Sequence, residues 1–269
     1  MEHQELFATT VAQFSKSASV CLVIVPTYKE SLNIERLIAE ILSQGSNFDI
    51  LVVDDNSPDG TADLVEAMAA KTERINLLRR PGKMGLGTAY LDGFKWGLSH
   101  GFSFLFQMDA DFSHKPIYLL EMLSIAERSI DVVLGSRNVP GGRVENWSKM
   151  REIISKGGSA YARIILGMPI MDCTGGFKCF RASALKQIDL DSIRSNGYAF
   201  QVEMNYRCVQ AGLRMCELPI TFPDRVAGQS KMEMSIITEA ALLVLKMRLG
   251  ELNKMLPRRL ANQPTPSVQ

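Results

Sequence analysis

Short apolar runs alternate with helical patterns through the first half of the chain. Residues 20–25 form a continuous run rich in valine and isoleucine that Pro26 is expected to end, and residues 31–42 then carry apolar side chains at helical spacing. Such a run is typical of a strand buried on both faces of a sheet. Strands that alternate with helices indicate a mostly parallel sheet with helices on both faces, so the sequence predicts an α/β fold.

The same pattern predicts the remaining elements. Further strands are expected at 50–53, 75–78, 102–108 and 131–134, and further helices at 62–70, in the stretch that ends near residue 98, and at 117–126. After about residue 145 the alternation weakens, and the pattern predicts helices at 148–166 and near 199–211 and a strand at 214–222. This second half is expected to complete the sheet.

Composition argues against several classes of function. The chain has 269 residues, of which 46% are hydrophobic and 22% charged, as in an ordinary globular protein. Its 30 Lys and Arg residues against 29 Asp and Glu residues give no support for nucleic-acid binding, and no nucleic-acid partner is predicted. The five cysteines include no CxxC pair and the three histidines are scattered, so neither a zinc site nor a disulfide framework is predicted. Chemistry with a hard metal on oxygen ligands stays open.

Acidic and polar side chains follow three of the expected strands. They occur in "PTYKE" after the first strand, "DDNSPDG" after the second and "DADFS" after the fourth. The carboxyl ends of parallel strands share one edge of a sheet, where ligands bind. Asp109 and Asp111 repel each other there unless a cation lies beside them. Aspartate oxygens suit Mg2+ or Mn2+, which take further ligands from water and substrate phosphates, so a metal-bound diphosphate is the expected occupant.

Two further motifs have open interpretations. The glycine-rich "PGKMGLG" at 81–87 lacks the Walker spacing and does not follow the first strand, so it is either a phosphate contact or flexible backbone leading into a helix. The later "FPDRVAGQSK" at 222–231 contains Arg225 and Lys231. As a loop it either brings two positive charges to a phosphate or stays solvated.

Nine motifs together resemble the dolichyl-phosphate or polyprenyl-phosphate mannose synthases, which are inverting family-2 glycosyltransferases of the GT-A fold. Over roughly residues 20 to 235 they are, in the order of that family, "VIVPTYKE", "VVDDNSPDGT", "PGKMGLGTAY", "MDADFSHKP", "GSRNVPGG", "SKGGSAYAR", "DCTGGFKCFR", "GYAFQVEM" and "FPDRVAGQSK". The resemblance implies transfer of mannose from GDP-mannose to a polyprenyl or dolichyl monophosphate, with inversion, to give polyprenyl-phosphate β-mannose. UDP-glucose or another sugar nucleotide is the alternative donor.

The resemblance also implies roles for individual residues on the donor side. The implied nucleotide-sugar site comprises Pro26, Tyr28, Glu30, Val53, Asp55, Asp109, Ala110, Asp111, Arg137, Arg225 and Lys231. Asp109 and Asp111 are implied to bind Mg2+ or Mn2+. Relatives have glutamine or serine at the position of Ser113, so Ser113 is a direct metal ligand, a ligand through water, or no participant.

Catalysis and acceptor binding are implied in the same way. Asp111, Arg225 and Lys231 would offset charge on the departing diphosphate. The residues implied to hold the acceptor phosphate are Arg137, Arg151 and Ser155. A lipid monophosphate is already anionic near neutral pH, so it can attack the sugar without a separate base.

The resemblance and the composition together suggest four segments. They are an N-terminal extension at 1–19, a GT-A catalytic domain at 20–235, an amphipathic helix at 236–256 and a disordered tail at 257–269. Residues 1–19 lack a secretory signal, and the apolar stretch 240–245 is far shorter than the ~20 residues that span a bilayer. We therefore expect a cytoplasmic protein, peripherally associated with the cytoplasmic face of a membrane through that helix or a small membrane-anchoring subunit. Packing of the helix on the catalytic domain is the alternative.

Overall fold

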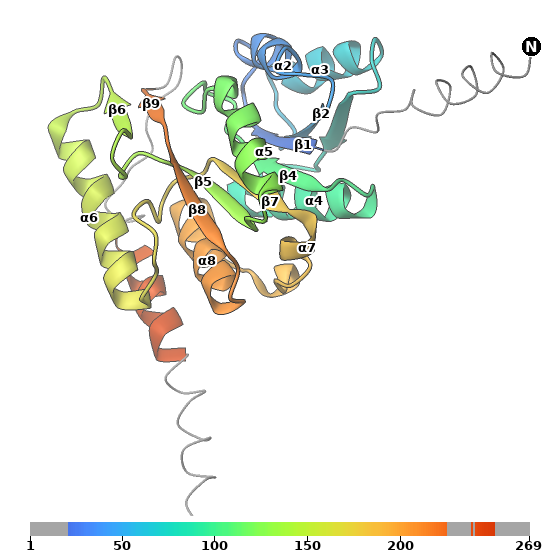
Figure 1. Cartoon of the computed structure of the whole chain (residues 1–269). Coiled ribbons are helices and arrows are strands. Elements are labelled where there is room, and N and C mark those ends of the chain that lie inside the picture. Colours follow the sequence, from blue (N-terminus) through green and yellow to red (C-terminus); the bar gives the residue numbers. More distant parts are fainter. Residues whose placement is uncertain (1–20, 225–237, 239, 251–269) are drawn as a thin grey trace, which may run out of the picture.

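A seven-stranded sheet runs through the molecule, with helices on both of its faces (Figure 1). The computed structural model describes residues 21–224, 238 and 240–250. The strands of the sheet are β1 (Cys21–Thr27), β2 (Phe48–Asp54), β3 (Ile75–Arg79), β4 (Phe104–Gln107), β5 (Val132–Ser136), β7 (Lys178–Arg181) and β8 (Met215–Pro219). A small second sheet pairs β6 (Arg143–Glu145) with β9 (Thr221–Pro223).

The strand order in the main sheet is β3-β2-β1-β4-β7-β5-β8. Neighbouring strands are parallel, except that β7 runs antiparallel to both β4 and β5. β7 therefore begins at the edge where β1, β2, β4 and β5 end. β3 and β8 end there as well, so the ends of all six parallel strands and the start of β7 share one edge of the sheet, where ligands bind in folds of this kind.

Each strand side chain enters one of two cores, because successive side chains point to opposite faces. Leu22 and Ile24 of β1 pack with α4, α6 and α8, whereas Val23 and Val25 pack with α2, α3 and α5. All four are fully buried, which explains the continuous apolar run. The helices are α2 (Ile34–Leu42), α3 (Thr61–Ala69), α4 (Leu86–Ser99), α5 (Leu119–Glu127), α6 (Lys149–Leu166), α7 (Ala182–Leu185) and α8 (Gly197–Gln210), with 3-10 turns at Pro116–Tyr118 and Leu190–Ser192.

Two expectations about the strands were wrong, and one strand was missed. Pro26 does not end β1, which continues to Thr27, because β4 pairs only with residues 21–24 and Pro26 needs no N–H on that side. The single strand expected at 214–222 is divided into β8 and β9, which belong to different sheets. β7 was not predicted, since its buried Lys178 interrupts the apolar pattern.

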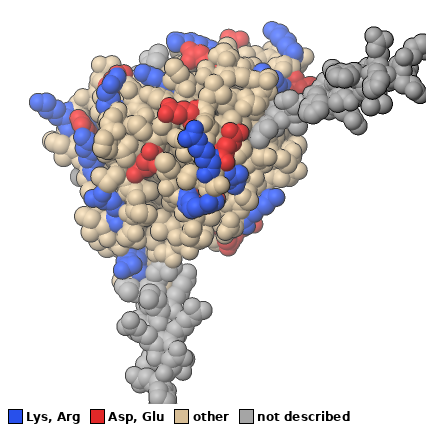
Figure 2. Space-filling model, in the orientation of Figure 1, with Lys and Arg blue, Asp and Glu red and all other residues tan. Residues whose placement is uncertain are grey.

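The outer surface mixes charges of both signs. On the face in Figure 2, basic and acidic side chains are interspersed, so binding of an anionic substrate depends on a local cluster. Residues 240–250 are helical and lie beside α6, where the Tyr161 hydroxyl donates to the Ala241 carbonyl at 3.1 Å (Figure 1). Among the described residues, no helix combines the length and the apolarity needed to cross a bilayer.

Two glycines let α4 lie close against the sheet. A Cβ on Gly93 would come within 2.5 Å of Ile24 Cγ2, and one on Gly97 within 2.5 Å of Leu105 Cδ2 and 2.8 Å of Leu22 Cδ2. α4 also carries Tyr90, so this close packing sets the depth at which that side chain enters the edge of the sheet.

We expect Gly97→Val to destabilise the protein. Its extra carbons would enter a filled core, and overpacking of this kind lowers the free energy of unfolding by about 1–3 kcal/mol. Gly157→Val is the matched control, since a Cβ there meets nothing within 4 Å. Urea unfolding of both variants measures the difference, and equal effects would contradict the packing argument.

Candidate active site

Two aspartates at the end of β2 have different surroundings. Asp54 is fully buried and accepts a hydrogen bond from the Thr27 hydroxyl at 2.8 Å, which ties β2 to β1. Asp55 Oδ2 accepts from the backbone N–H groups of Met84 and Gly85 at 3.1 and 3.2 Å. The predicted nucleotide residue Asp55 therefore also anchors the glycine-rich loop.

A buried arginine completes this anchor. Arg80 Nε lies 3.1 Å from Asp55 Oδ1, and both side chains are almost fully buried. The ammonium of Lys83 lies 4.3 Å from the centre of the Tyr28 ring. The loop 81–87 is thus held against the ends of β1 and β2, where it leads into α4.

The other predicted nucleotide residues lie at the same strand ends. Pro26 and Val53 are register partners in β1 and β2, and the Val53 side chain is fully buried in the core. The Glu30 carboxylate accepts a hydrogen bond from Asn33 Nδ2 at 2.8 Å. The Glu30 N–H donates to the Thr61 hydroxyl at 3.0 Å, so the start of α3 fixes this turn.

The turn after β4 holds the two predicted metal-binding aspartates. The Tyr90 hydroxyl of α4 donates to Asp109 Oδ1 at 2.8 Å, and the Asp109 N–H donates to His114 Nδ1 at 2.9 Å. Asp111 Oδ1 accepts from the Ser113 N–H at 3.1 Å. Local backbone contacts and one helix therefore set the direction of both carboxylates.

Left-handed backbone follows three of the strands at this edge. Lys29 after β1, Asn56 after β2 and Phe112 after β4 have φ angles of 63°, 56° and 62°. Non-glycine residues in this region cost about 1–3 kcal/mol each and cluster at functional sites. Ala110, between the two aspartates, is buried. The strained turns indicate that the edge is shaped for a ligand.

The groups that hold Asp109 are electrically neutral. Burial, helped by the Asp109 carboxylate, raises the pKa of Tyr90 well above its usual value, so the hydroxyl remains a donor. Burial lowers the pKa of His114, and its Nδ1 accepts a hydrogen bond, so its proton lies on Nε2. No ion pair among the described residues involves Asp109.

Arg137, at the end of β5, is held by a buried carboxylate. Its Nε and Nη2 donate to the two oxygens of Asp172 at 2.7 and 2.6 Å. Burial by itself would raise the pKa of Asp172, but the charge and hydrogen bonds of Arg137 lower that pKa below its usual value. The guanidinium lies 5.6 and 5.2 Å from the ring centres of Trp147 and Phe222. A phosphate would thus meet a guanidinium that is already oriented.

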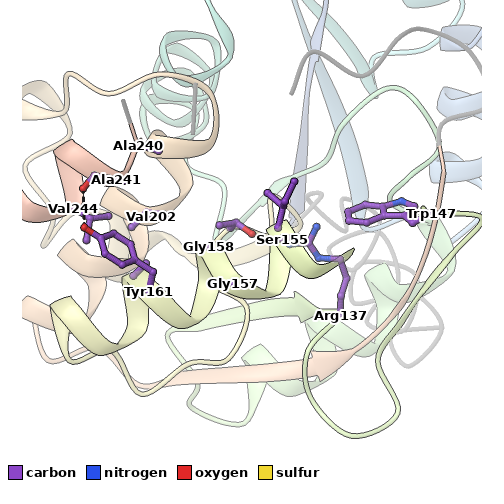
Figure 3. A pocket seen from close by; sticks show the side chains of 13 residues that line it. Arg137, Trp147, Ser155, Gly157, Gly158, Tyr161, Val202, Ala240, Ala241 and Val244 are labelled. Carbon is purple, nitrogen blue, oxygen red and sulfur yellow. Dashed lines mark hydrogen bonds between the residues drawn. The ribbon is translucent and has the colours of Figure 1, made fainter. Parts of the chain in front are cut away.

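A largely apolar cavity of about 290 Å³ lies beside Arg137, between α6 and residues 240–250 (Figure 3). Ser155 of α6, one of the residues predicted to hold the acceptor phosphate, lines this cavity. Arg151, one turn earlier, lies 3.9 Å over the Trp147 ring and donates to Asp224 at 2.6 Å. The rest of the lining includes Ile154, Tyr161, Ala162, Val202, Ala240 and Val244.

One aromatic ring connects the two halves of the site. Phe222 lies edge-on to His114 and to Trp147, with ring centres 5.5 Å apart in both pairs, and it also contacts the Arg137 guanidinium. The structure thus brings the aspartates of β4 and the acceptor-side residues to one edge of the sheet. Arg225 and Lys231 lie outside the described residues.

Several side chains of the site were missed in the sequence. Tyr90, Asp172, Lys178 and Gln201 lie within the quoted motifs, yet no local pattern marks them, because their contacts join residues far apart in the chain. The one available signal was Lys178, a lysine inside the apolar "FKCF". A charge in such a run has to be paired when it is buried.

A family model described as Glycosyl transferase family 2 matches residues 22–189. The chain belongs to this family. An undecaprenyl-phosphate mannosyltransferase of Micrococcus luteus is 45% identical over 229 residues, which cover 85% of this chain and 94% of that protein. A polyprenol monophosphomannose synthase of Mycolicibacterium smegmatis is 43% identical over 224 residues, which cover 83% of this chain and 84% of that protein.

Solved structures share the fold of this family-2 glycosyltransferase. Glucosyl-3-phosphoglycerate synthase from Mycobacterium tuberculosis, in complex with Mn2+, UDP-glucose and glycerol 3-phosphate, superposes with a TM-score of 0.60 at 16% identity, covering 87% of this chain and 82% of that chain. Its complex with Mg2+ and UDP gives a TM-score of 0.62 at 16% identity, and the superposition covers 87% of this chain and 81% of that chain. The predicted family and the GT-A fold are confirmed.

The donor set of the glycosyltransferase fits a hard cation only together with a substrate. No three His, Cys, Asp or Glu side chains of the described residues are grouped so that they could hold a metal ion. Asp109 and Asp111 offer carboxylate oxygens, which Mg2+ and Mn2+ prefer. With two carboxylates, the remaining ligands would come from water and a diphosphate.

We expect Asp172→Asn to destabilise the enzyme strongly at neutral pH. Removing one partner leaves the buried Arg137 charge uncompensated, which costs about 3–5 kcal/mol in comparable pairs. Because the pKa of Asp172 is lowered in the folded state, the wild-type advantage is present above the unfolded pKa of about 4 and is lost as the pH falls through the folded value.

Urea unfolding of wild type and variant between pH 7 and pH 3 measures this difference. Asp131→Asn is the control, since Asp131 pairs with the exposed Arg214. It should lose much less stability. A loss that is equal in both variants, or that does not shrink in acid, would contradict the role of the buried pair.

Proposed function

We propose that this family-2 glycosyltransferase transfers mannose from GDP-mannose to a polyprenyl or dolichyl monophosphate, with inversion, to give polyprenyl-phosphate β-mannose and GDP. The observation that carries the proposal is the apolar cavity beside Arg137 and Ser155. An acceptor with an anionic head and a hydrocarbon tail needs polar donors next to an apolar lining. The relatives named as an undecaprenyl-phosphate mannosyltransferase and a polyprenol monophosphomannose synthase support the same class of acceptor.

The donor is proposed to bind at the ends of β1, β2 and β4. Tyr28 and the loop anchored by Asp55 would border the nucleoside, and Asp109 and Asp111 would hold Mg2+ or Mn2+ at the diphosphate. When bound, such a cation neutralises charge on the departing diphosphate. Ser113 supports this site through its backbone N–H, whether or not its hydroxyl is a ligand.

The acceptor phosphate is proposed to act as the nucleophile itself. Its second pKa is about 6 by analogy with phosphorylated side chains, so it is charged near neutral pH and needs no general base. Arg137, oriented by Asp172, and Arg151, stacked on Trp147, would place it in line with the leaving diphosphate. Attack from the side opposite the diphosphate inverts the anomeric carbon.

The loop that contains Arg225 and Lys231 is proposed to supply further positive charge to the phosphates. Support comes from the charge balance of the described residues. Arg137 and Arg151 are each paired with a carboxylate, so together with Asp172 and Asp224 they carry no formal net charge. An additional cation would offset repulsion between donor and acceptor phosphates.

A panel of sugar nucleotides tests the donor and acceptor. We expect the protein, incubated with Mg2+ or Mn2+ and a short-chain polyprenyl phosphate, to consume GDP-mannose and form a mannosyl phosphate lipid that mass spectrometry detects. A chelator should abolish turnover, because the diphosphate would lose its counter-charge. Turnover of UDP-glucose but not of GDP-mannose would overturn the mannose assignment.

Asp111→Ala in the same assay tests the metal site. Turnover should fall at least about 100-fold, the usual scale for the loss of one electrostatic stabiliser of a transition state. Asp191→Ala is the control, since that carboxylate is 83% exposed and pairs with Lys95 at the surface. Undiminished activity of Asp111→Ala at saturating metal would refute the role of Asp111.

Contact with a membrane surface is proposed for an exposed apolar stripe on α6. Met150, Ile153 and Ile164 fall on one face of this helix and are 66%, 65% and 72% exposed. The neighbouring helical residues 240–250 expose Leu242 and others in the same way. Apolar stripes flanked by basic residues are typical of interfacial helices, and this one borders the proposed acceptor cavity.

We expect the double variant Ile153→Glu/Ile164→Glu to bind membranes at least about fivefold more weakly, because two charges would enter the lipid interface. Co-sedimentation with vesicles of phosphatidylcholine and phosphatidylglycerol measures the bound fraction. Ile117→Glu, at a position that is 69% exposed outside α6, is the control. Equal losses of vesicle binding in the two variants would contradict the proposal that α6 faces the membrane. If the wild-type protein does not bind vesicles at all, a small membrane-anchoring subunit is favoured instead.

A further inference from the structure

A fully buried lysine reaches the edge of the sheet close to the β4 aspartates. Lys178 is the first residue of β7, and its ammonium donates a hydrogen bond to Gln201 Oε1 of α8. Burial lowers the pKa of Lys178 to about 7, although nearby carboxylates, among them Asp172 and Asp109, raise it. An apolar side chain of similar size would avoid the cost of burying this charge, so stability alone does not account for the lysine.

The lysine determines the direction of the Gln201 carboxamide. An ammonium only donates hydrogen bonds, so Gln201 has to present its carbonyl oxygen to Lys178 and turn its NH2 group away. The NH2 group then faces the segment before β7. A Cβ on Gly176 would lie 3.3 Å from Gln201 Nε2, 3.4 Å from His114 Cε1 and 3.8 Å from Asp109 Oδ2. These three side chains converge where Gly176 has no side chain.

The Gln201 NH2 group has no hydrogen-bond acceptor among the described residues. Gln201 is also not the only amide near Lys178 that could accept a hydrogen bond from its ammonium. Gln107, its register partner on β4, has a buried carbonyl oxygen without a hydrogen bond in the described part of the chain. The pairing with Gln201 therefore leaves an NH2 group beside Gly176, near the Asp109 carboxylate, rather than simply satisfying an ammonium.

We propose that Gln201 contacts the donor sugar, with its NH2 group donating a hydrogen bond to a hydroxyl of the glycosyl group. Lys178 acts through it as a positioning residue that fixes the carboxamide. This assignment rests on the proposed function, because it needs a sugar nucleotide whose diphosphate is held at Asp109 and Asp111. Because Asp109 Oδ2 borders the convergence at Gly176, the glycosyl group attached to that diphosphate would come within reach of it.

Binding without acceptor separates the sugar contact from the diphosphate contacts. Calorimetric titration of Gln201→Ala with GDP-mannose and with GDP, both in Mg2+, should show a 3- to 10-fold loss of affinity for GDP-mannose, the size of about one hydrogen bond. Affinity for GDP should be unchanged. Equal losses for the two ligands, or no loss for GDP-mannose, would overturn the contact.

The positioning role has its own test. Lys178→Met keeps the length of the side chain and releases Gln201, so it should produce a selective loss for GDP-mannose of the same kind. The double variant should be no weaker than Gln201→Ala alone, because Lys178 acts through Gln201. Additive losses would overturn the positioning role.

Two controls keep the result interpretable. Gln210→Ala, at the exposed end of α8, should bind both ligands as wild type does. Thermal unfolding checks that each variant is folded, and Gln201→Met replaces the alanine variant if that one is not. UDP-glucose and UDP serve as a second ligand pair. If wild type binds UDP-glucose more tightly than GDP-mannose, the mannose assignment fails. The contact of Gln201 with the sugar is then still tested, by the ratio of the affinities for UDP-glucose and for UDP in wild type and variant.

Discussion

The site depends on the insertion of β7 between β4 and β5. Because β7 is antiparallel to both, the segment before it arrives where β4 and β5 end. That places Asp172 against Arg137 and Gly176 beside Asp109. β7 alone joins the half of the sheet that ends in carboxylates to the half that ends in the arginine, so the distance between the proposed donor and acceptor sites is set by this pairing.

The two halves hold their charges in opposite ways. Asp109 is held by neutral donors and acceptors and forms no ion pair within the described residues, whereas Arg137 is paired directly with a carboxylate that cancels much of its field. This difference supports the proposed cation on the β4 side, while the proposed contribution of Arg137 is mainly geometric. Bidentate pairing of this kind gives a guanidinium a fixed direction, which suits recognition of a phosphate in one orientation.

The parallel half of the fold and the pair of aspartates could be predicted because their signals are local. Runs of buried residues mark β1, β2 and β4, and Asp109 and Asp111 directly follow one of them. The rest depends on partners that are distant in sequence. Nothing local reveals that Asp55 would be tied to an arginine and a loop, or that β7 would lie between two strands, since pairing of distant segments is decided by the whole sheet.

The size of the cavity limits what the acceptor side can recognise. At about 290 Å³ it lies at the lower end of the range for small-molecule pockets, whereas a polyprenol carries many isoprene units. It could therefore enclose only the part of such a lipid next to the phosphate, and under the proposed membrane contact the rest of the chain would remain in the bilayer. The exposed stripe on α6 borders this cavity, so the lipid would not have to leave the membrane to reach Arg137. Discrimination would then rest on the headgroup and the first units, because the distal chain never meets the protein.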